Sequence, residues 1–337
     1  MTAANAATVV GAGGIGVALA WSLARAGWQV VLVERDAAKL AAARADGIAV
    51  DAQPAQRVQA IAFDDWRPAE GAIVLLCTKT YDNPQVLART GAQLTLIPVQ
   101  NGYDPLLEQH AHHGEGIASF VSECAPDRPH TRITRTGALH LGARGSASPA
   151  ERALFARLAA ALTQAGLFKV ATVDDVRPYK ATKLMYNAAI SPLAASAGVD
   201  NAMLLTDPLA KRLFFALLRE NHAILRYAGL PLARIGPFHP DTVIRILRTP
   251  GLPELMAMFF RPSLRGTYCS MAPDIGSGRT EIDAYNGHLV RLAGNLPCPL
   301  NRAAVALVER ISAERLAPHR RHLDAMVPAL AHARGRS

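Results

Sequence analysis

The fold is decided near the start of the chain, where Ala7-Thr8-Val9-Val10 runs directly into Gly11-Ala12-Gly13-Gly14-Ile15-Gly16. The first four residues favour a buried strand, and apolar residues recur with helical spacing after Gly16. Gly11 allows a tight turn, Gly13 lets backbone approach a pyrophosphate, and Gly16 lets the helix pack closely on the strand. An ordinary glycine-rich turn has the same local pattern. Strand, turn and helix together nevertheless predict a dinucleotide site at residues 11–16.

The next strand supports this interpretation and raises the question of which dinucleotide binds. Residues 29–33 are mostly apolar and end at Glu34, 18 residues after Gly16, where a carboxylate that binds the ribose is expected. A carboxylate at this point favours the free 2′-hydroxyl of NAD. The adjacent Arg35 favours the 2′-phosphate of NADP. The sequence leaves the choice between NAD and NADP open.

Two further apolar runs end in polar residues, as expected for strands of a parallel sheet covered on both faces. Residues 72–77 lead into Thr78-Lys79-Thr80, and residues 94–100 lead into Asn101-Gly102. Ligands of such sheets bind at the carboxyl ends of the strands, so Lys79 and Asn101 are candidate cofactor-binding residues. Asn-Gly also marks plain turns. At the end of this strand, however, Asn101 would lie beside the nicotinamide.

The remainder of the chain divides into a short mixed region and a long helical one. We expect a strand at residues 116–122, a hairpin within 132–142, a helix over 150–165 and a last strand at 168–173. Only helical patterns follow Asp174. The predicted architecture is α/β: a Rossmann-type, doubly wound parallel sheet in residues 1–172, followed by an all-α domain in residues 173–337.

One predicted helix, residues 182–193, carries a row of polar side chains. Lys183, Asn187 and Ser191 are spaced at i, i+4 and i+8, so they drift only about 40° per step around a helix and share one face. Polar groups on an otherwise apolar helix are costly unless they face a ligand or water. The alternative is an amphipathic helix whose lysine simply reaches solvent. As a site, the row suits ketone reduction, because an ammonium stabilises the developing alkoxide and donates its proton.

Two shorter patterns follow in the helical region. Asp207 and Pro208 predict the start of a long helix, with Asp207 as its cap. Further on, Thr280 and Asp283 have the spacing of a capping box, which would place Glu281 in the first turn of another helix. Taken alone, Glu281 would then merely complement the helix dipole.

Composition narrows the functional classes. Of the 337 residues, 50% are hydrophobic and 19% charged, which is typical of a packed globular protein. The four cysteines have no spacing suited to zinc, so no metal site is expected. The net charge of +9 comes from scattered residues, so we expect no nucleic-acid partner. Neither a membrane span nor a signal peptide is recognisable, which predicts a cytoplasmic protein. The oligomeric state stays open, with a homodimer as one alternative.

Taken together, these motifs resemble the ketopantoate reductase (2-dehydropantoate 2-reductase) family over nearly the whole chain. The resemblance rests on the order and spacing of residues 11–16, Asn101-Gly102, Lys183-Leu184 with Asn187 and Pro192-Leu193, Ser270-Met271 with Asp274, Thr280-Glu281-Ile282-Asp283 with Asn286-Gly287, and Pro299 with Asn301-Arg302.

The resemblance implies an enzyme that reduces a small branched 2-keto acid, 2-dehydropantoate or a close analogue, with NADPH. By analogy Lys183 is the general acid. Asn101 touches nicotinamide and substrate, and Glu281 lies near both. The resemblance also implies that the substrate is contacted by Asn187, Ser191 and Ser270. It implies that the cofactor is contacted by Lys79 and Ser122. The active site would lie between a Rossmann domain and a helical domain.

Two departures from the family pattern leave the substrate open. Ser191 stands where an asparagine is usual, and the segment from Ser270 to Glu281 is one residue shorter than the pattern. The protein could therefore serve pantothenate synthesis or a specialised pathway. Two other functional classes also stay open: a different two-domain dehydrogenase of hydroxy acids or opines, and a dinucleotide sensor without catalysis.

Overall fold

The computed structural model describes residues 5–91, 93–112 and 114–334. Its contacts divide the chain into two compact units. The first unit holds the chain up to Gln100 together with Asp104–Arg177, and the second holds Asn101–Tyr103 together with the chain from Pro178. The boundary predicted near residue 172 falls inside the last strand of the first unit, five residues before the observed division.

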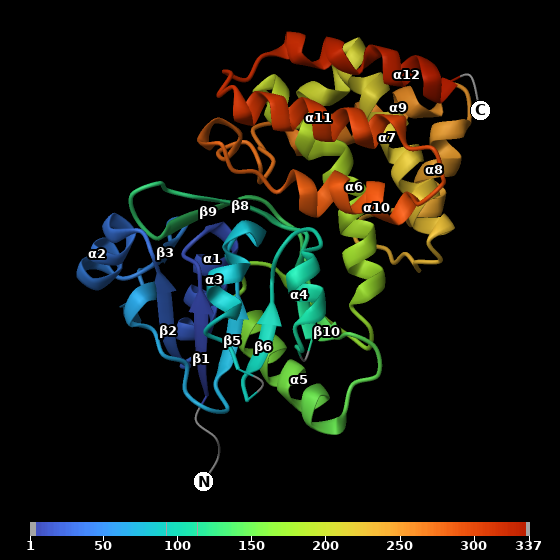
Figure 1. Ribbon diagram of the computed structural model, residues 1–337. Coiled ribbons are helices and arrows are strands. Elements are labelled where there is room, and N and C mark those ends of the chain that lie inside the picture. The colour runs from blue at the N-terminus through green and yellow to red at the C-terminus, as the bar shows by residue number, and fades with distance from the viewer. Residues whose placement is uncertain (1–4, 92, 113, 335–337) are drawn as a thin grey trace. The chain divides into compact units, whose positions relative to one another are not determined.

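The first unit is built on a parallel sheet of five strands in the order β4-β2-β1-β5-β6 (Figure 1). Its strands are β1 (Ala6–Val10), β2 (Gln29–Glu34), β4 (Gln59–Ala62), β5 (Ile73–Leu76) and β6 (Thr95–Pro98). The chain moves outward from β1 through β2 to β4, then returns to the other side of β1 for β5 and β6. Ligands of such sheets bind at the carboxyl ends of the strands where the order reverses, which here is between β1 and β5.

Both faces of this sheet are covered, because alternate strand residues enter different cores. Val9 and Leu32 pack with buried side chains of α1 (Gly14–Arg25) and α5 (Pro149–Gln164). Val10 packs instead with α3 (Asn83–Leu87). This is the doubly wound α/β arrangement predicted from the sequence, and that prediction is confirmed. The other short elements of the unit are α2 (Ala37–Asp46), α4 (Pro105–Gln109), η1 (Phe63–Asp65) and η2 (Thr80–Asp82).

Two three-stranded sheets complete the first unit, and they correct the prediction for its second half. One has the order β11-β10-β7, with β11 (Lys169–Val173), β10 (Ala138–Ala143) and β7 (Gly114–Ala118). The other has the order β3-β9-β8, with β3 (Ala49–Val50), β9 (His130–Arg135) and β8 (Val121–Cys124).

The single strand at 116–122 and the hairpin within 132–142 were both wrong. Residues 116–122 are split between β7 and β8, and β9 does not pair with β10. Instead β8 pairs with β9, and β7 pairs with β10, both antiparallel. The four strands thus form one long hairpin, with an interruption between β7 and β8 and another between β9 and β10. A Cβ on Gly137 would lie 2.5 Å from the Phe120 backbone nitrogen, so the two breaks face each other at close range.

The described part of the second unit is entirely helical, as predicted. Its longer helices are α6 (Arg177–Ala197, which begins in the first unit), α7 (Pro208–Tyr227), α8 (Pro240–Arg248), α9 (Leu252–Leu264), α10 (His288–Ala293), α11 (Pro299–Ala313) and α12 (Val327–Arg334). Its short turns are η3 (Met203–Leu205), η4 (Ile275–Ser277), the π-helical η5 (Asp283–Gly287) and η6 (Arg320–Met326). The Asp207 cap is confirmed, because its carboxylate accepts a 2.8 Å hydrogen bond from Ala210 N.

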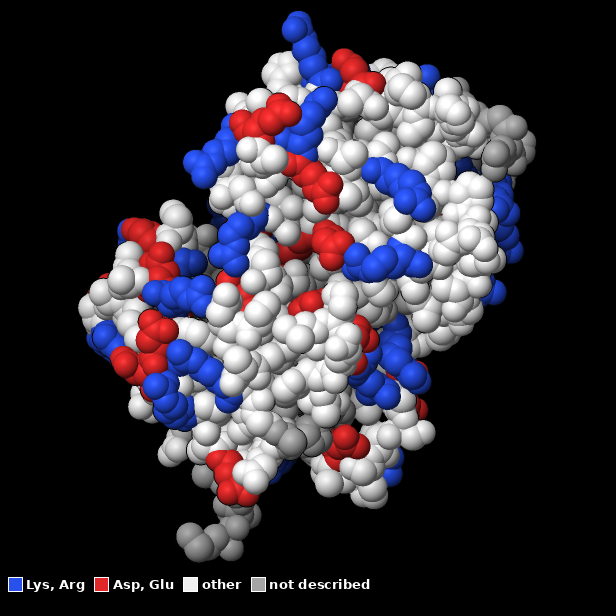
Figure 2. Space-filling view, viewed as in Figure 1, with Lys and Arg blue, Asp and Glu red and all other residues white. Residues whose placement is uncertain are grey.

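The surface carries charges of both signs. On the face shown in Figure 2, Lys and Arg side chains are intermixed with Asp and Glu over both units. In the part of the chain that the structure describes, no helix combines the length and the hydropathy needed to cross a bilayer.

Candidate active site

The turn after β1 requires glycine at several of its positions, Gly11 and Gly16 among them. Gly11 has φ +102°, and its N–H donates to Val33 O at 2.9 Å, which ties the turn to β2. A Cβ added at Gly16 would lie 1.9 Å from the carbonyl oxygen of Gly11. Backbone cannot yield by that much, so Gly16 is required for α1 to pack on the turn.

The same turn leaves open space where a phosphate group would bind. A Cβ added at Gly13 would meet nothing within 4 Å. The first intrahelical bond of α1 runs from Val17 N to Gly13 O, so the N–H groups of residues 14–16 have no partner within the helix. The first turn of α1 contains no acidic side chain. Free amides, the positive end of the helix dipole and open space together fit a pyrophosphate.

The structure brings further predicted cofactor residues to this turn. A Cβ on Gly14 would lie 2.6 Å from Ser122 Oγ, so Ser122 of β8 borders the start of α1. Ala12 is buried, and Ile15 packs partly buried against the core. Lys79 lies beyond the carboxyl end of β5, next to Thr78, whose backbone nitrogen would be 3.0 Å from a Cβ on Gly11.

Glu34, the predicted ribose ligand, is held by backbone donors. Its Oε2 accepts from Ala12 N at 2.7 Å, and its Oε1 accepts from Arg35 N at 2.7 Å and Asp36 N at 2.9 Å. These three bonds fix the carboxylate beside the glycine turn, at the end of β2. Such a fixed negative charge repels a 2′-phosphate and accepts hydrogen bonds from a free ribose hydroxyl.

Two cations stand close to Glu34. The Arg35 guanidinium lies 5.1 Å from the centre of the Phe63 ring and 3.7 Å from Asp82, with about half of its side chain exposed. Lys39, in the first turns of α2, donates to Ala12 O at 3.2 Å. We did not predict Lys39 from the sequence. Its signal was available, because Asp36 caps α2 and so places Lys39 on the first turn after the β2 end.

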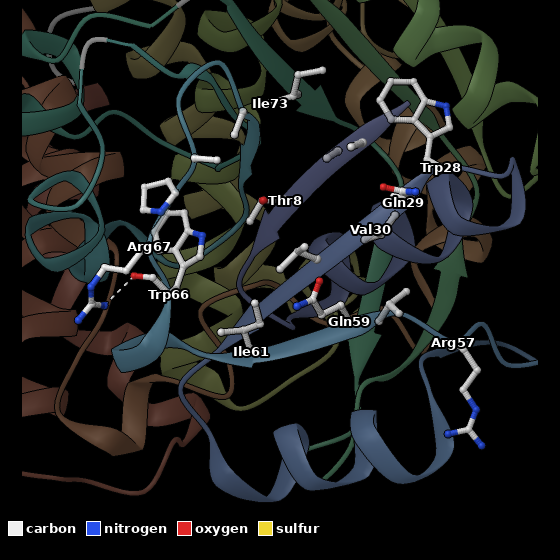
Figure 3. A pocket seen from close by; sticks show the side chains of 17 residues that line it. Thr8, Trp28, Gln29, Val30, Arg57, Gln59, Ile61, Trp66, Arg67 and Ile73 are labelled. Atoms are coloured by element: carbon white, nitrogen blue, oxygen red, sulfur yellow. Dashed lines mark hydrogen bonds between the residues drawn. The ribbon is translucent and has the colours of Figure 1, made fainter. Parts of the chain in front are cut away.

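A cavity of about 610 Å³ lies at the other end of the parallel sheet (Figure 3). It is lined by the first residues of β1, including Thr8, by the start of β2 around Gln29, and by Trp66 and Ile73. Since the glycine turn follows the carboxyl end of β1, this cavity is separate from the predicted dinucleotide site.

In the second unit, α6 carries the polar row predicted from the sequence, but its three members differ in burial. Lys183 and Asn187 are half-buried, whereas Ser191 is only 2% exposed. The Cys269 thiol donates to the Ser191 carbonyl at 3.6 Å. Lys183 and Asn187 therefore form the accessible part of the row, and Ser191 lies inside the helical packing.

Asn101 follows a strand of the first unit but belongs with the helical one. The N–H of Tyr103 donates to Ala284 O at 2.9 Å, and the Tyr103 ring stacks on His288 at 4.3 Å. Gly102 has φ +78°, and a Cβ there would lie 2.6 Å from the Tyr285 ring. The segment Asn101–Tyr103 is thus placed in the unit that holds Lys183 and Glu281. The three predicted catalytic residues share one compact unit.

Glu281 and Ser270 are connected through a tyrosine that we did not predict. Tyr285 is fully buried, and its hydroxyl donates to Glu281 Oε2 at 3.4 Å and lies 3.1 Å from Ser270 Oγ. Burial raises the pKa of Tyr285 well above its ordinary value, so the hydroxyl keeps its proton. Because this proton points towards Glu281, the Tyr285 oxygen accepts a hydrogen bond from the Ser270 hydroxyl. The i, i+4 spacing of Glu281 and Tyr285 was the available signal.

The capping box predicted at Thr280 and Asp283 was wrong. The helix begins near Ile282 without a side-chain cap, and Asp283–Gly287 form a π-helical turn. Asp283 instead pairs with Arg291 at 2.6 Å. π-turns occur frequently at functional sites, and this one contains Tyr285.

A buried asparagine network holds α6 in place. Pro192 has no N–H, so the Ala188 carbonyl lacks its usual partner within the helix. Asn286 supplies that donor at 2.8 Å, and its amide also donates to Asn301 Oδ1 at 2.9 Å. A second asparagine, Asn221, donates to the carbonyl of Met185, also on α6, at 2.9 Å. Three positions of the family pattern, 192, 286 and 301, thus support the helix that carries Lys183 and Asn187.

Replacing Asn286 by alanine should loosen this support. We expect the free energy of unfolding to fall by about 1–3 kcal/mol, because buried polar groups on Ala188 and Asn301 lose a partner. Urea denaturation followed by circular dichroism measures the effect. Asn295→Ala, at an exposed asparagine in the same unit, is the matched control. Equal losses in the two variants would contradict the assigned role.

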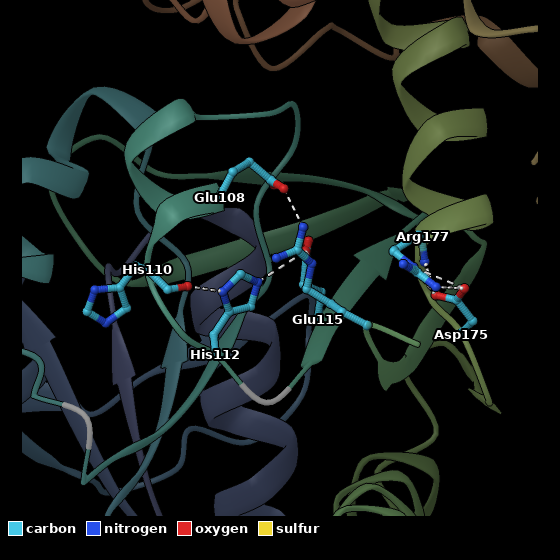
Figure 4. Close-up of polar contacts among 7 residues, drawn as sticks. Glu108, His110, His112, Glu115, Asp175 and Arg177 are labelled. Carbon is cyan, nitrogen blue, oxygen red and sulfur yellow. Dashed lines mark hydrogen bonds and ion pairs between the residues drawn. The ribbon is translucent and has the colours of Figure 1, made fainter. Parts of the chain in front are cut away.

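A separate ionic cluster in the first unit lies outside the predicted site (Figure 4). The side chain of His112 is fully buried and contacts Glu115 at 3.2 Å, and the Arg144 guanidinium pairs with Glu115 at 3.0 Å and with Glu108. These contacts join α4, β7 and the end of β10. Since both partners of the His112–Glu115 pair are buried, the cluster serves packing.

Comparisons with known proteins agree with this organisation. Residues 7–144 match the family model "Ketopantoate reductase PanE/ApbA", and residues 175–312 match "Ketopantoate reductase PanE/ApbA C terminal". The 2-dehydropantoate 2-reductase of Aquifex aeolicus is 26% identical over 231 residues, 65% of this chain and 69% of that protein.

Two solved structures are similar over most of the chain. A PanE/ApbA family ketopantoate reductase from Ralstonia eutropha is 26% identical with a TM-score of 0.72, covering 93% of this chain and all of that one. D-mandelate dehydrogenase with NADH and anilino(oxo)acetate shares the fold, with a TM-score of 0.75 at 17% identity, covering 93% of this chain and 100% of that one. The two family matches lie one on the sheet unit and one on the helical unit, and the chain belongs to the ketopantoate reductase family.

Proposed function

We propose that this NAD(P)H-dependent oxidoreductase reduces a small branched 2-keto acid, 2-dehydropantoate or a close analogue, with NADPH as hydride donor and Lys183 as general acid. The observation that carries the proposal is the grouping of Asn101, Lys183 and Glu281 in one compact unit, together with the chain of hydroxyls that leads from Ser270 to Glu281. The glycine turn and its free amides, in the other unit, supply a dinucleotide site.

Each side chain then has a defined task. When bound, the reduced nicotinamide supplies a hydride to the carbonyl carbon. Lys183 donates a proton to the carbonyl oxygen as negative charge develops there, and Asn101 orients the carbonyl by donating from its amide. Asn187 and Ser270 bind the rest of the keto acid. Tyr285 holds Glu281 in a fixed position from inside the helical core.

The direct test follows the absorbance of reduced nicotinamide with a panel of 2-keto acids, run in parallel with NADPH and NADH. We expect oxidation with small branched 2-keto acids, and the ratio of the two rates gives the cofactor preference. Absence of oxidation with every keto acid and both cofactors would overturn the proposal and favour a dinucleotide sensor.

Glu34→Gln should shift the cofactor preference towards NADPH. The carboxylate charge beside the glycine turn opposes a 2′-phosphate, while Arg35 and Lys39 stay in place to attract it. We expect the ratio of kcat/KM for NADPH to that for NADH to rise about tenfold, which corresponds to about 1.4 kcal/mol. Asp64→Asn, at a well-exposed carboxylate of the same unit, is the control. An unchanged ratio would show that Glu34 does not discriminate between a 2′-hydroxyl and a 2′-phosphate on the ribose.

A further inference from the structure

The cavity at the amino ends of the parallel strands exists because part of the sheet has no helix over it. Parallel strands are usually connected through a helix that covers the sheet. Within residues 5–91, the connection from β4 to β5 contains only the short turn η1, followed by Pro68 and by Gly71 at φ +72°. Trp66 of this connection packs beside Val10, and the sheet face beyond it lines the cavity.

The floor of this cavity is a row of three neighbouring side chains. Thr8 of β1 pairs with Val31 of β2, and Val31 pairs with Gln59 of β4, so all three lie on the same face of the sheet. Strands of a parallel sheet that is covered by helices are normally apolar on both faces. The polar residues at two of these three positions indicate that this face contacts water or a ligand instead of a helix.

Two buried polar groups point to a ligand. Thr8 is 9% exposed and Trp66 only 2%, and in Figure 3 the Thr8 hydroxyl and the Trp66 indole nitrogen face the same open space. In the ranges that the structure describes, neither side-chain group has a hydrogen-bond partner. A buried donor without a partner is costly. Because an indole N–H can only donate and a hydroxyl can also donate, the two groups together fit an acceptor oxygen.

The charges around the cavity indicate which kind of acceptor fits. The exposed Arg57 and Arg67 belong to its lining, and none of its 17 lining residues is Asp or Glu. Arg57 donates to the Arg44 carbonyl at 3.2 Å, and Arg67 donates to the Trp66 carbonyl at 2.9 Å. Among the described residues, neither guanidinium pairs with a carboxylate. The lining therefore carries positive charge that favours an anion.

We propose that this cavity binds a small apolar carboxylate, at the end of the sheet opposite the glycine turn. The carboxylate accepts hydrogen bonds from the Trp66 indole and the Thr8 hydroxyl, and the apolar body of the ligand packs on Val31 and Ile61. The cavity volume of about 610 Å³ lies in the range of small-molecule sites. The two arginines attract the anion without having to contact it.

Calorimetric titration of the full chain with 3-phenylpropanoate tests the site. We expect saturable binding of this acid. The uncharged 3-phenylpropanamide has the same shape and should bind at least about tenfold more weakly. Trp66→Phe and Thr8→Val each remove one donor and keep the shape of the side chain. Each should raise the Kd for 3-phenylpropanoate about tenfold or more, the usual loss of a hydrogen bond to a charged acceptor. Thr95→Val, at the start of β6 and outside the cavity, is the matched control.

Two further variants locate the bound acid. Val31→Phe fills the cavity from its floor and should abolish binding, even if Thr8→Val or Trp66→Phe does not fold. Lys183→Ala should leave the Kd for 3-phenylpropanoate unchanged, so the result does not depend on the catalytic role proposed for that lysine. Absence of saturable binding would overturn the proposal. So would an unchanged Kd in the cavity variants, a loss confined to Lys183→Ala, or equal binding of the acid and the amide.

Discussion

Replacing Lys183 by alanine is expected to lower kcat for keto-acid reduction by about two orders of magnitude or more, the usual loss when a proton donor is removed. The effect should fall on kcat more than on KM, because the ammonium interacts most strongly with the charge that develops during hydride transfer. Initial rates at saturating NADPH and keto acid measure it.

Two further variants make this result specific. Lys211→Ala removes a half-buried lysine from α7 of the same unit and should keep wild-type turnover. Lys183→Arg keeps the positive charge but offers a much weaker acid, so it should retain substrate binding while kcat stays low. Dinucleotide affinity, measured by fluorescence titration, should be the same in all three proteins. Wild-type turnover in Lys183→Ala would refute the role of Lys183.

The second large effect is a loss of stability in Gly16→Ala, which the neighbouring Gly13→Ala should not share. Gly16→Ala places a Cβ 1.9 Å from the Gly11 carbonyl oxygen, so α1 must shift away from the turn. We expect a loss of about 3 kcal/mol or more in the free energy of unfolding, seen as a lower Tm, since overpacking against backbone cannot be relieved by a side-chain rotation.

Gly13→Ala should leave the stability of the protein unchanged but weaken its binding of NADPH. Its backbone, at φ −87° and ψ −176°, suits alanine, and the added methyl group meets no protein atom within 4 Å. The Tm should therefore stay close to that of the wild type. The methyl group would occupy the space that fits a pyrophosphate, so the Kd for NADPH should rise about tenfold or more. A stable Gly16→Ala protein, or an unchanged Kd in Gly13→Ala, would contradict the assignment of the turn.

Prediction from the sequence succeeded where the determinants are local. The run from β1 through the glycine turn to β2 follows from strand propensity, glycine geometry and helical spacing, all within about 30 residues. The Asp207 cap is equally local. Lys183 and Asn187 were placed on one accessible side of α6 by spacing alone, but spacing could not show that Ser191 is buried, because that depends on segments distant in the sequence, such as Cys269.

Prediction failed where pairing partners are distant. The alternation in residues 132–142 correctly indicates extended chain, but it cannot show that β9 pairs with β8 and β10 with β7. The spacing of Thr280 and Asp283 fits a capping box, but no such box forms. Asp283 pairs with Arg291 instead and begins a π-helical turn. Tyr285 was missed because its role depends on Ser270, which is 15 residues earlier in the chain.

The assignment of Asn101–Tyr103 to the helical unit bears on how the protein could be dissected. The chain passes between its units three times, at residues 100, 103 and 177, so no single cut yields both halves intact. A fragment beginning at Pro178 would lack the tyrosine that stacks on His288 and the glycine that abuts Tyr285. A fragment designed to contain the whole helical unit should therefore also include the three residues after Gln100. They could be added as a separate peptide or joined to the fragment through a linker.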